Sequence, residues 1–266
     1  MINTEKRNPL TTHIDRMTTP EMLAVMQREN ENAVAAVGQV LPDMTVAVEK
    51  IAARMKEGGR LFYVGCGTSG RLGVLDAAEC PPTFGIAPDR VIAVVAGGER
   101  AMRSAIEGSE DDGDAGKRAI AAYGLTDKDT VVGISAAGGA AFVLSAIAEA
   151  HAAGCYTVGI SSNAGAPLSL AVDTTITPDT GAEVVTGSTR MKAGTAQKLI
   201  LNMISTGVMI RLGYVCQNLM INLKPMNRKL RERMIRITAE LLPCSEEAAR
   251  QRLETVGWDI RKAIEM

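Results

Sequence analysis

The stretch of residues 60–71 reads Arg-Leu-Phe-Tyr-Val-Gly-Cys-Gly-Thr-Ser-Gly-Arg and is the strongest indication of the fold class in the sequence. Its first half is a short apolar run, which predicts a buried strand, and its second half is a glycine-rich turn that leads into a helix. A turn of this kind presents backbone N–H groups and the positive end of a helix to an anion. We therefore expect Gly67, Thr68 and Ser69 to contact a phosphate group.

The glycine-rich turn by itself is compatible with a dinucleotide, a sugar phosphate or a purely structural role. A dinucleotide is disfavoured because residues 96–98, after the next predicted strand, read Ala-Gly-Gly and offer no acidic residue for a ribose hydroxyl. The turn also lacks the Gly-Lys-Ser/Thr ending of a nucleotide-binding P-loop. A phosphorylated small molecule is the favoured ligand, and a structural turn is the alternative.

Apolar runs and helical segments alternate on either side of this turn. This pattern predicts an α/β fold, a parallel five-stranded sheet flanked by helices in a flavodoxin-like three-layer sandwich. Ligands bind at the carboxyl ends of such strands, which adds Ser135 and Gly138 as expected ligand contacts. The expected strands are 61–64, 91–95, 130–134, 156–160 and 174–177, and the expected helices between them are 71–78, 100–107, 113–123, 140–153 and 166–172.

Helical segments precede and follow the predicted sheet. A hydroxyl, a proline and an acid at residues 19–21 indicate a helix start, and long helices are expected over 191–212 and 225–242. We expect a helical N-terminal arm over 1–43, the α/β domain over 44–222 and a small helical C-terminal unit over 223–266.

The composition narrows the class of protein. The chain has 266 residues and a formal net charge of −1, so neither nucleic acids nor membrane surfaces are expected partners. Its five cysteines show no Cys-x-x-Cys spacing and its two histidines lie far apart, which argues against a disulfide framework or a transition-metal site. No apolar signal core or membrane-spanning run is evident. We expect a cytoplasmic protein that uses no metal or cofactor.

Two acidic positions are candidates for proton transfer. Glu79 precedes Cys-Pro-Pro, and its apolar neighbours are expected to desolvate the carboxyl and raise its pKa, as a general acid requires. Glu110 lies in the acidic run 107–112, which we expect to reach the same edge of the sheet. Two carboxylates that flank a ligand are suited to paired proton transfers. The alternatives are a solvent-exposed helix end for Glu79 and a solvated acidic turn for Glu110.

The approach to the long helix supplies further candidates. We expect Ser188 and Thr189 to cap this helix and its free N–H groups to form a second anion site. Glu183 and Lys192 complete the expected ligand contacts, because they flank this turn. Lys192 and Lys198 stand out on an otherwise apolar helix, either as ligand-binding ammonium groups or as exposed positions.

Together these motifs resemble the sugar isomerase (SIS) domain and, more closely, the N-acetylmuramic acid 6-phosphate etherases. The resemblance extends from about residue 13 to about residue 220, and the Glu-Cys-Pro-Pro block at 79–82 and the block at 190–198 are specific to this family. The matching blocks are 14–16, 67–73, 76–83, 96–99, 107–111, 181–188 and 190–198.

The resemblance implies a lyase that converts N-acetylmuramic acid 6-phosphate into N-acetylglucosamine 6-phosphate and D-lactate in peptidoglycan recycling. It implies that Glu79 protonates the departing lactate oxygen and that Glu110 removes the C2 proton of the open-chain sugar. Elimination is then followed by addition of water at C3, without a metal or cofactor. A homodimer is expected, because superfamily relatives complete their sites across subunits.

One loop departs from the family pattern. Residues 135–142 read Ser-Ala-Ala-Gly-Gly-Ala-Ala-Phe, where the family usually has Ala-Ala-Ser-Gly-Arg-Thr-Pro-Tyr. Ala137 and Ala140 thus lack hydroxyls and Gly139 replaces an arginine. This change motivates a second hypothesis, a non-catalytic sugar-phosphate sensor. A sugar-phosphate isomerase is a third hypothesis, which the Glu-Cys-Pro-Pro block disfavours.

Overall fold

Five parallel strands form the centre of the fold in the order β2-β1-β3-β4-β5, as a computed structural model of residues 2–266 shows. The predicted sheet is confirmed. Because β2 and β3 lie on opposite sides of β1, the strand order reverses beside the carboxyl end of β1, where ligands bind in open α/β sheets. The strands are β1 (Leu61–Gly65), β2 (Val91–Val95), β3 (Thr130–Ile134), β4 (Tyr156–Ile160) and β5 (Thr174–Ile176).

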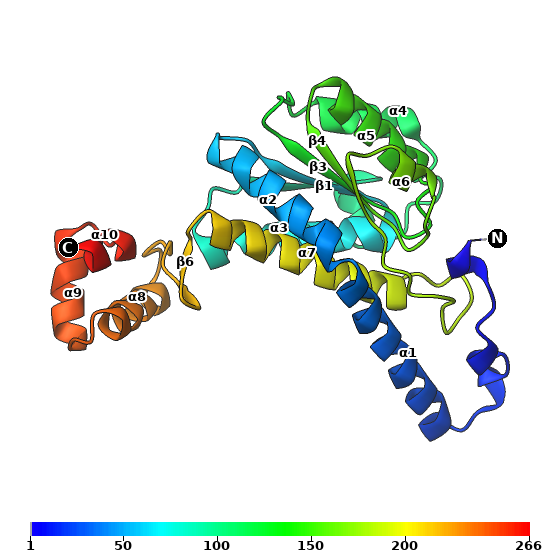
Figure 1. Ribbon diagram of the computed structural model, residues 1–266, viewed down its shortest axis with the longest axis horizontal. Coiled ribbons are helices and arrows are strands. Elements are labelled where there is room, and N and C mark those ends of the chain that lie inside the picture. The colour runs from blue at the N-terminus through cyan, green and yellow to red at the C-terminus, as the bar shows by residue number, and fades with distance from the viewer. Residues whose placement is uncertain (1) are drawn as a thin grey trace.

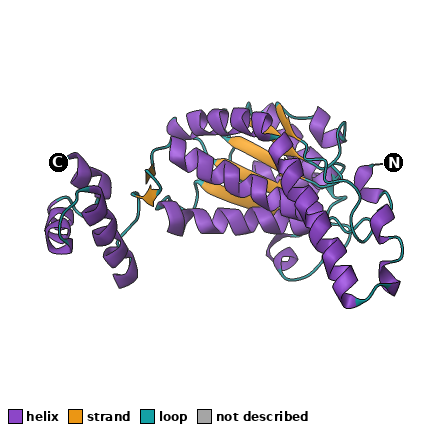
Figure 2. Ribbon diagram, turned by 60° about the horizontal axis from the view of Figure 1, so that its bottom comes forward, coloured by secondary structure: helices purple, strands orange, loops and turns teal. Residues whose placement is uncertain are grey.

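Helices cover both faces of the sheet (Figures 1 and 2). Alternate residues of β1 point to opposite faces, so Leu61 and Tyr63 join one buried core and Phe62 and Val64 join the other. This two-sided burial explains why β1 carries no charged residue and no alternation of polar and apolar positions. The first core is covered by α2 (Leu41–Lys56), α3 (Gly67–Phe84) and α7 (Lys192–Arg211), and the second by α4 (Gly113–Ala121), α5 (Ala141–Ala152) and α6 (Pro167–Leu170).

The N-terminal helix α1 (Thr19–Gln39) extends away from the sheet (Figure 1). It begins with a capping-box sequence, in which the Glu21 carboxylate accepts hydrogen bonds from the Thr18 N–H at 2.8 Å and from the Thr18 hydroxyl at 2.6 Å. Three short 3-10 turns precede it: η1 (Asn3–Glu5), η2 (Pro9–Thr11) and η3 (Ile14–Arg16). The first of these turns lies beside the loop after β4, where the Asn3 N–H donates to the Asn163 side-chain oxygen at 2.8 Å.

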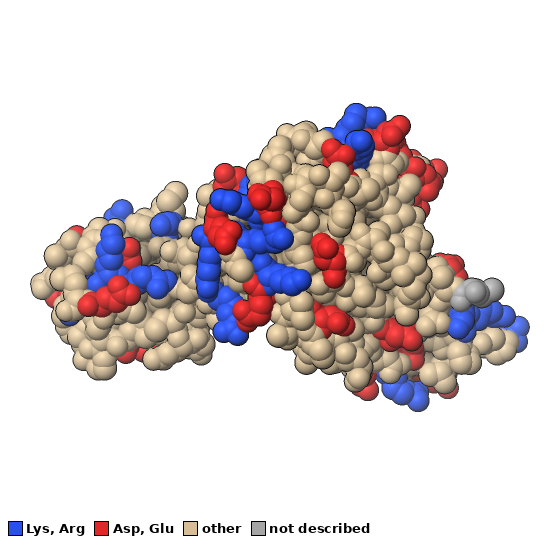
Figure 3. Space-filling model, turned by 45° about the horizontal axis from the view of Figure 1, so that its top comes forward, with Lys and Arg blue, Asp and Glu red and all other residues tan. Residues whose placement is uncertain are grey.

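The C-terminal helices pack around a core of their own, apart from the sheet (Figure 1). Trp258 contributes to this core, and the Arg231 guanidinium lies 5.4 Å from its ring centre. These elements are β6 (Val215–Cys216), β7 (Leu219–Met220), α8 (Arg228–Leu241), α9 (Glu246–Thr255) and α10 (Ile260–Glu265). On the face drawn in Figure 3, basic side chains gather between this unit and the α/β body, with acidic side chains among them. Among residues 2–266, no helix is both long and apolar enough to cross a membrane.

Two predicted helices differ from the structure. The helix expected over 71–78 is α3, which continues through Pro81 and Pro82 to Phe84 and ends at Gly85 in the left-handed conformation (φ 64°). Each proline lacks the N–H that would donate to the carbonyl four residues earlier, so the last turn is held by fewer hydrogen bonds, one of them from the Gly85 N–H to the Pro81 carbonyl at 2.9 Å. The helix expected over 100–107 is instead the 3-10 turn η4 (Gly98–Met102), which Gly97 and Gly98 start with positive φ.

Candidate active site

The glycine-rich turn joins β1 to α3 at the carboxyl edge of the sheet, as predicted. Gly67 has φ +52°, a conformation that favours glycine, and Thr68 and Ser69 form the first turn of the helix. The backbone N–H groups of these three residues donate to no acceptor within residues 2–266. The first N–H groups of a helix need such partners and carry partial positive charge, so this turn can accept an anion.

The Ser69 side chain is buried against α7. Its hydroxyl donates to Gln197 Oε1 at 2.9 Å, and Gln197 is 1% exposed. The amide nitrogen of Gln197 has no hydrogen-bond partner in the described part of the chain. The sequence analysis did not single out Gln197, although a glutamine on an otherwise apolar helix is the same kind of signal as Lys192.

The loop after β3 lies beside the turn, because Gly65 and Ile134 are paired in the sheet. Ser135 Oγ accepts a hydrogen bond from the Gly138 N–H at 3.1 Å. A side chain at Gly138 would place its Cβ 2.5 Å from that of Ala166, so this position requires glycine. The structure therefore brings Ser135 and Gly138 together at the same edge as the turn.

The N-terminus of α7 is occupied by a carboxylate of the chain. Glu183, which is fully buried, accepts hydrogen bonds of 3.0 Å from the N–H groups of both Lys192 and Ala193. Ser188 and Thr189 lie before the helix and do not cap it, since Met191 is the capping residue and makes no side-chain bond. The predicted cap is wrong, and Glu183 occupies two N–H groups of the expected second anion site, because a carboxylate forms charge-assisted bonds with them. Contact of Ser188, Thr189 and Glu183 with a ligand stays a prediction.

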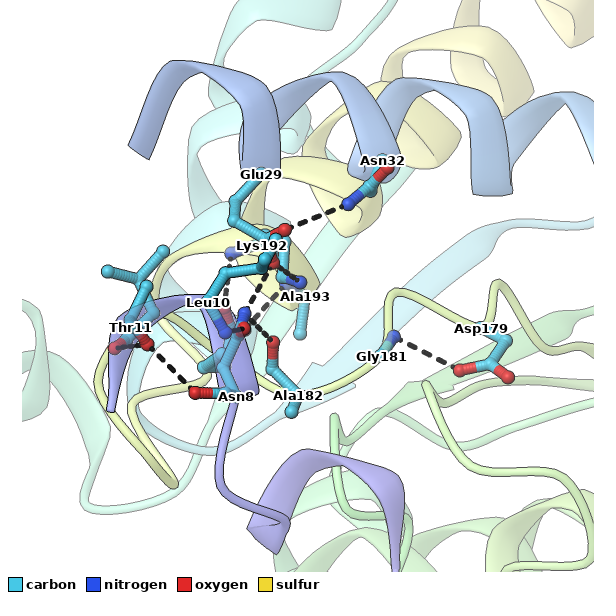
Figure 4. Close-up of polar contacts among 12 residues, drawn as sticks. Asn8, Leu10, Thr11, Glu29, Asn32, Asp179, Gly181, Ala182, Lys192 and Ala193 are labelled. Carbon is cyan, nitrogen blue, oxygen red and sulfur yellow. Dashed lines mark hydrogen bonds and ion pairs between the residues drawn. The ribbon is translucent and has the colours of Figure 1, made fainter. Parts of the chain in front are cut away.

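Lys192 is buried in an ion pair with Glu29 of α1 (Figure 4). Glu29 also accepts hydrogen bonds from Asn8 at 2.6 Å and from Asn32 at 3.1 Å. The ammonium is thus committed to a contact inside the chain, and its role in ligand binding stays a prediction. Lys198 is exposed. Sequence spacing gave no signal for Glu29, which lies 163 positions from Lys192.

The structure places only one of the two predicted catalytic carboxylates near the turn. The Glu110 carbonyl accepts a hydrogen bond from the Phe142 N–H at 3.0 Å, so Glu110 lies beside the start of α5, next to the loop after β3, with its side chain exposed. Burial, followed by the charges of Glu110 and Asp111, also raises the pKa of Cys66, the residue after β1, to about 12. Glu79 lies near the other end of α3, about 18 Å along the helix from Gly67 at 1.5 Å per residue. Its side chain is exposed, so the expected burial of Glu79 beside the phosphate site is wrong for a single chain.

A buried polar network stands behind the turn. The Asp76 carboxylate accepts hydrogen bonds from the Tyr63 hydroxyl at 2.9 Å, from Asn202 at 2.6 Å and from Ser205 at 3.1 Å. Burial, together with Asp76, raises the pKa of Tyr63 well above its ordinary value, so the phenol stays protonated and donates. The network joins β1, α3 and α7 and fixes the helix that carries Ser69. In residues 2–266, His, Cys, Asp and Glu form no group of three suited to a metal ion.

Comparison with known proteins identifies the family. The chain is 48% identical to the N-acetylmuramic acid 6-phosphate etherase of Caldanaerobacter subterraneus subsp. tengcongensis, over 99% of this chain and 86% of that protein. It is 49% identical to the etherase of Halalkalibacterium halodurans, over 99% of this chain and 88% of that protein. The chain belongs to the N-acetylmuramic acid 6-phosphate etherase family.

Similarity to SIS-domain proteins supports the fold of this etherase family member. The family profile of the glucokinase regulatory protein N-terminal SIS domain matches residues 43–151. The phosphoheptose isomerase of Neisseria gonorrhoeae superposes with a TM-score of 0.56 at 19% identity, over 72% of this chain and 98% of that protein. The phosphoheptose isomerase of Francisella tularensis superposes with a TM-score of 0.55 at 16% identity, over 73% of this chain and 100% of that protein. The predicted SIS fold is confirmed.

The loop that departs from the etherase pattern is open in the structure. Ala140 is the capping residue of α5 and makes no side-chain hydrogen bond. A Cβ added at Gly139 would meet no atom of residues 2–266 within 4 Å apart from the neighbours in sequence, and the residue is exposed. A Cβ at Gly139 would therefore fit without displacing other residues.

Proposed function

We propose that this chain is an N-acetylmuramic acid 6-phosphate etherase, a lyase that releases D-lactate and N-acetylglucosamine 6-phosphate. The observation that carries the proposal is the 48% identity with an etherase over 99% of the chain. The substrate chemistry suits peptidoglycan recycling in the cytoplasm, since a lactyl ether on an amino sugar is a cell-wall fragment and the phosphate marks it as a metabolic intermediate.

The phosphate of this substrate would bind at the glycine-rich turn. The unpartnered N–H groups of Gly67, Thr68 and Ser69 in residues 2–266 support this placement. The hydroxyls of Thr68 and Ser135 lie at the same edge of the sheet and can donate to phosphate oxygens. Ala137 and Ala140 cannot, so the turn would carry a larger share of phosphate binding than in relatives with hydroxyls at these positions.

The two carboxylates would divide the proton transfers. Glu110 removes the C2 proton, which the C1 aldehyde of the open-chain sugar acidifies, and the electron pair forms the C2–C3 double bond. Glu79 donates a proton to the ether oxygen on C3, so D-lactate departs with its hydroxyl protonated rather than as an alkoxide. Water then adds to C3, giving its proton to Glu79 while Glu110 returns a proton to C2. The two steps leave both carboxyls as they began.

A second copy of the chain would bring Glu79 to the site. In one chain the Glu110 backbone contacts the start of α5, beside the loop after β3, whereas Glu79 is exposed on α3, roughly 18 Å along the helix from Gly67. Apolar side chains that a partner could cover are exposed on α1, α2 and α7 and next to them: Leu23, Val34, Leu41, Val46, Met203 and Ile210. We therefore propose a homodimer with composite sites.

The test is D-lactate release from N-acetylmuramic acid 6-phosphate by the purified protein. We expect release by the wild type, a loss of at least about a hundredfold in Glu79→Gln, as for removal of a general acid, and normal release by the exposed control Glu57→Gln. No lactate from the wild type would overturn the proposal. Calorimetric binding of N-acetylglucosamine 6-phosphate without lactate release would favour the sensor instead, the function to which the altered loop 135–142 points.

A further inference from the structure

Ser69 and Gln197 form a buried hydrogen-bonded pair at the base of the proposed phosphate site. The Ser69 hydroxyl donates to Gln197 Oε1 at 2.9 Å, and the two residues are 7% and 1% exposed. A serine hydroxyl has one proton. In this arrangement the Ser69 proton is donated to Gln197, so Ser69 can only accept hydrogen bonds from a ligand. An ionised phosphate oxygen has no proton to donate to it.

The other half of the Gln197 amide is unsatisfied. Its Nε2 is buried and has no hydrogen-bond partner among residues 2–266. A buried N–H group without an acceptor is costly and uncommon in folded proteins. Half a turn about the last side-chain bond exchanges the oxygen and the nitrogen of the amide, so that Nε2 can donate to Ser69 Oγ. The Ser69 proton is then free to point toward a ligand.

We propose that Gln197 is a positioning residue that sets the Ser69 hydroxyl as a donor to the substrate phosphate. With phosphate bound, Gln197 Nε2 donates to Ser69 Oγ, and Ser69 donates to a phosphate oxygen at the first turn of α3. The buried hydrogen bond between Ser69 and Gln197 is thereby kept with its direction reversed, the amide atom without a partner becomes Oε1 in place of Nε2, and one charge-assisted hydrogen bond to the phosphate is gained. The proposal deepens the proposed function and rests on its phosphate site.

The same geometry makes the site prefer a ligand group that only accepts hydrogen bonds. While Nε2 donates to it, Ser69 Oγ must direct its own proton outward, so the hydroxyl favours a pure acceptor over a neutral hydroxyl group of a ligand. Gln197 does not touch the ligand in this arrangement. Its substitution should therefore change substrate affinity through Ser69 and leave the proton transfers of Glu79 and Glu110 unaffected.

A double-mutant cycle tests the proposal. Gln197→Met keeps the length of the side chain but cannot donate, and we expect KM for N-acetylmuramic acid 6-phosphate to rise about tenfold, or about 1.4 kcal/mol, with kcat within about twofold. In the Ser69→Ala background the same change should alter KM by less than about twofold, because the residue acts through Ser69. Gln251→Met, an exposed glutamine in α9, is the matched control. An unchanged KM, or an undiminished effect without Ser69, would overturn the proposal.

A second variant distinguishes the proposed role of Gln197 from a folding defect. Gln197→Glu keeps the shape of the side chain, and its ionised carboxylate can only accept, so above the pKa of this carboxyl it holds the Ser69 proton and should raise KM at least as much as Gln197→Met. Wild-type affinity in this variant would refute the proposal. Thermal unfolding of each variant shows whether it is folded under assay conditions.

Binding separates this proposal from the proposed function. The same cycle is read by calorimetry with N-acetylglucosamine 6-phosphate, which requires no turnover. Coupling between Ser69 and Gln197 in binding without D-lactate release would support the role of Gln197 and overturn the etherase proposal. D-lactate release without coupling between Ser69 and Gln197 would support the etherase proposal and overturn the role of Gln197. Absence of both lactate release and binding in the wild type would overturn both.

Discussion

Thr68 and Glu79 lie on the same helix, three turns apart. Thr68 belongs to the first turn of α3, beside N–H groups that have no partner in residues 2–266, and Glu79 is exposed close to the other end. At 1.5 Å per residue the two are about 16 Å apart along the axis. This separation supports the proposed composite site, in which Glu79 reaches the sugar phosphate from a second copy.

The first prediction follows from this separation. Glu79→Gln and Glu110→Gln should each be inactive alone, because each removes one proton-transfer group. After subunit exchange, half of the dimers are mixed, and each mixed dimer has one site with both carboxylates intact. We expect about a quarter of wild-type D-lactate release from an equal mixture, by the symmetry of a two-fold dimer. The measurement is lactate release before and after exchange.

Native mass spectrometry supplies the control by showing that mixed dimers have formed. If mixed dimers are present and lactate release stays at the level of the separate variants, each site takes both carboxylates from one chain. A protein that is monomeric at assay concentration and active would contradict the composite site as well.

Cys66 reports which carboxylate lies near the turn. Burial comes first among the causes that raise its pKa to about 12, and Glu110 and Asp111 follow. Removing the Glu110 charge should lower the pKa of Cys66, increase the thiolate fraction at alkaline pH and speed alkylation, since the thiolate is the nucleophile. We expect Glu110→Gln to shift the pH profile of Cys66 iodoacetamide labelling, followed by peptide mass spectrometry, to lower pH.

Glu79→Gln is the matched control for this experiment. Glu79 is not among the groups that shift the pKa of Cys66, so its labelling profile should coincide with that of the wild type. Equal shifts in the two variants would mean that both carboxylates lie near Cys66, contrary to the structure.

The sheet could be predicted from the sequence because its signal is local. The three central strands β1, β3 and β4 are buried on both faces, so residues such as those of 61–64 are apolar without alternation. The glycine-rich turn could be placed for the same reason, since Gly67 is needed for its positive φ. The position of Glu79 within a helix could not be predicted in the same way. Prolines such as Pro81 and Pro82 usually end a helix before them, whereas here they lie in its last turn.

The polar contacts of α7 could not be predicted from the sequence, because most of their partners lie far away along the chain. Ser188 and Thr189 fit the pattern of a cap, but Glu183 reaches the helix end through the fold of the preceding loop. Lys192 finds Glu29 in a helix from the other end of the chain, and Gln197 meets Ser69 128 positions away. Such partners are set by packing, and no spacing in the sequence records them.

Glu183 should stabilise the fold by capping α7. Glu183→Ala removes the acceptor of two buried N–H groups, and we expect the free energy of unfolding to fall by about 2 kcal/mol, the upper part of the range for helix caps. Ser188→Ala should change it by less than about 0.5 kcal/mol. Urea unfolding of both variants measures the difference. If Ser188→Ala is as costly as Glu183→Ala, the capping role assigned to the carboxylate is refuted.

The buried ion pair should show strong coupling. Lys192→Met leaves the Glu29 charge buried with only Asn8 and Asn32 as partners in residues 2–266, and we expect a loss of about 3–5 kcal/mol in the free energy of unfolding. Adding Glu29→Gln removes the unpaired charge and should recover at least half of this loss. Urea unfolding of the single and double variants gives the coupling energy. Losses that simply add would mean that the pair contributes nothing as a pair.

Ala140→Thr should improve both stability and substrate binding. Ala140 has extended backbone angles (φ −61°, ψ 117°) at the start of α5 and offers no side-chain acceptor. The Phe142 N–H already donates to the Glu110 carbonyl at 3.0 Å, so a threonine hydroxyl would accept from Val143. Such a cap adds about 1 kcal/mol to the free energy of unfolding. The same hydroxyl lies at the sheet edge of the proposed phosphate site, so KM should fall as well.

The exposed Ala148 in the middle of α5 provides the matched control. Ala148→Thr makes the same chemical change in the interior of a helix, where the backbone N–H groups are already bonded, and it should lower stability slightly because threonine is a poorer helix former than alanine. Differential scanning calorimetry compares the two variants, and lactate release gives KM. A stabilised Ala140→Thr with an unchanged KM would place the cap correctly but separate the loop after β3 from the phosphate, leaving the turn at Gly67 to bind it alone.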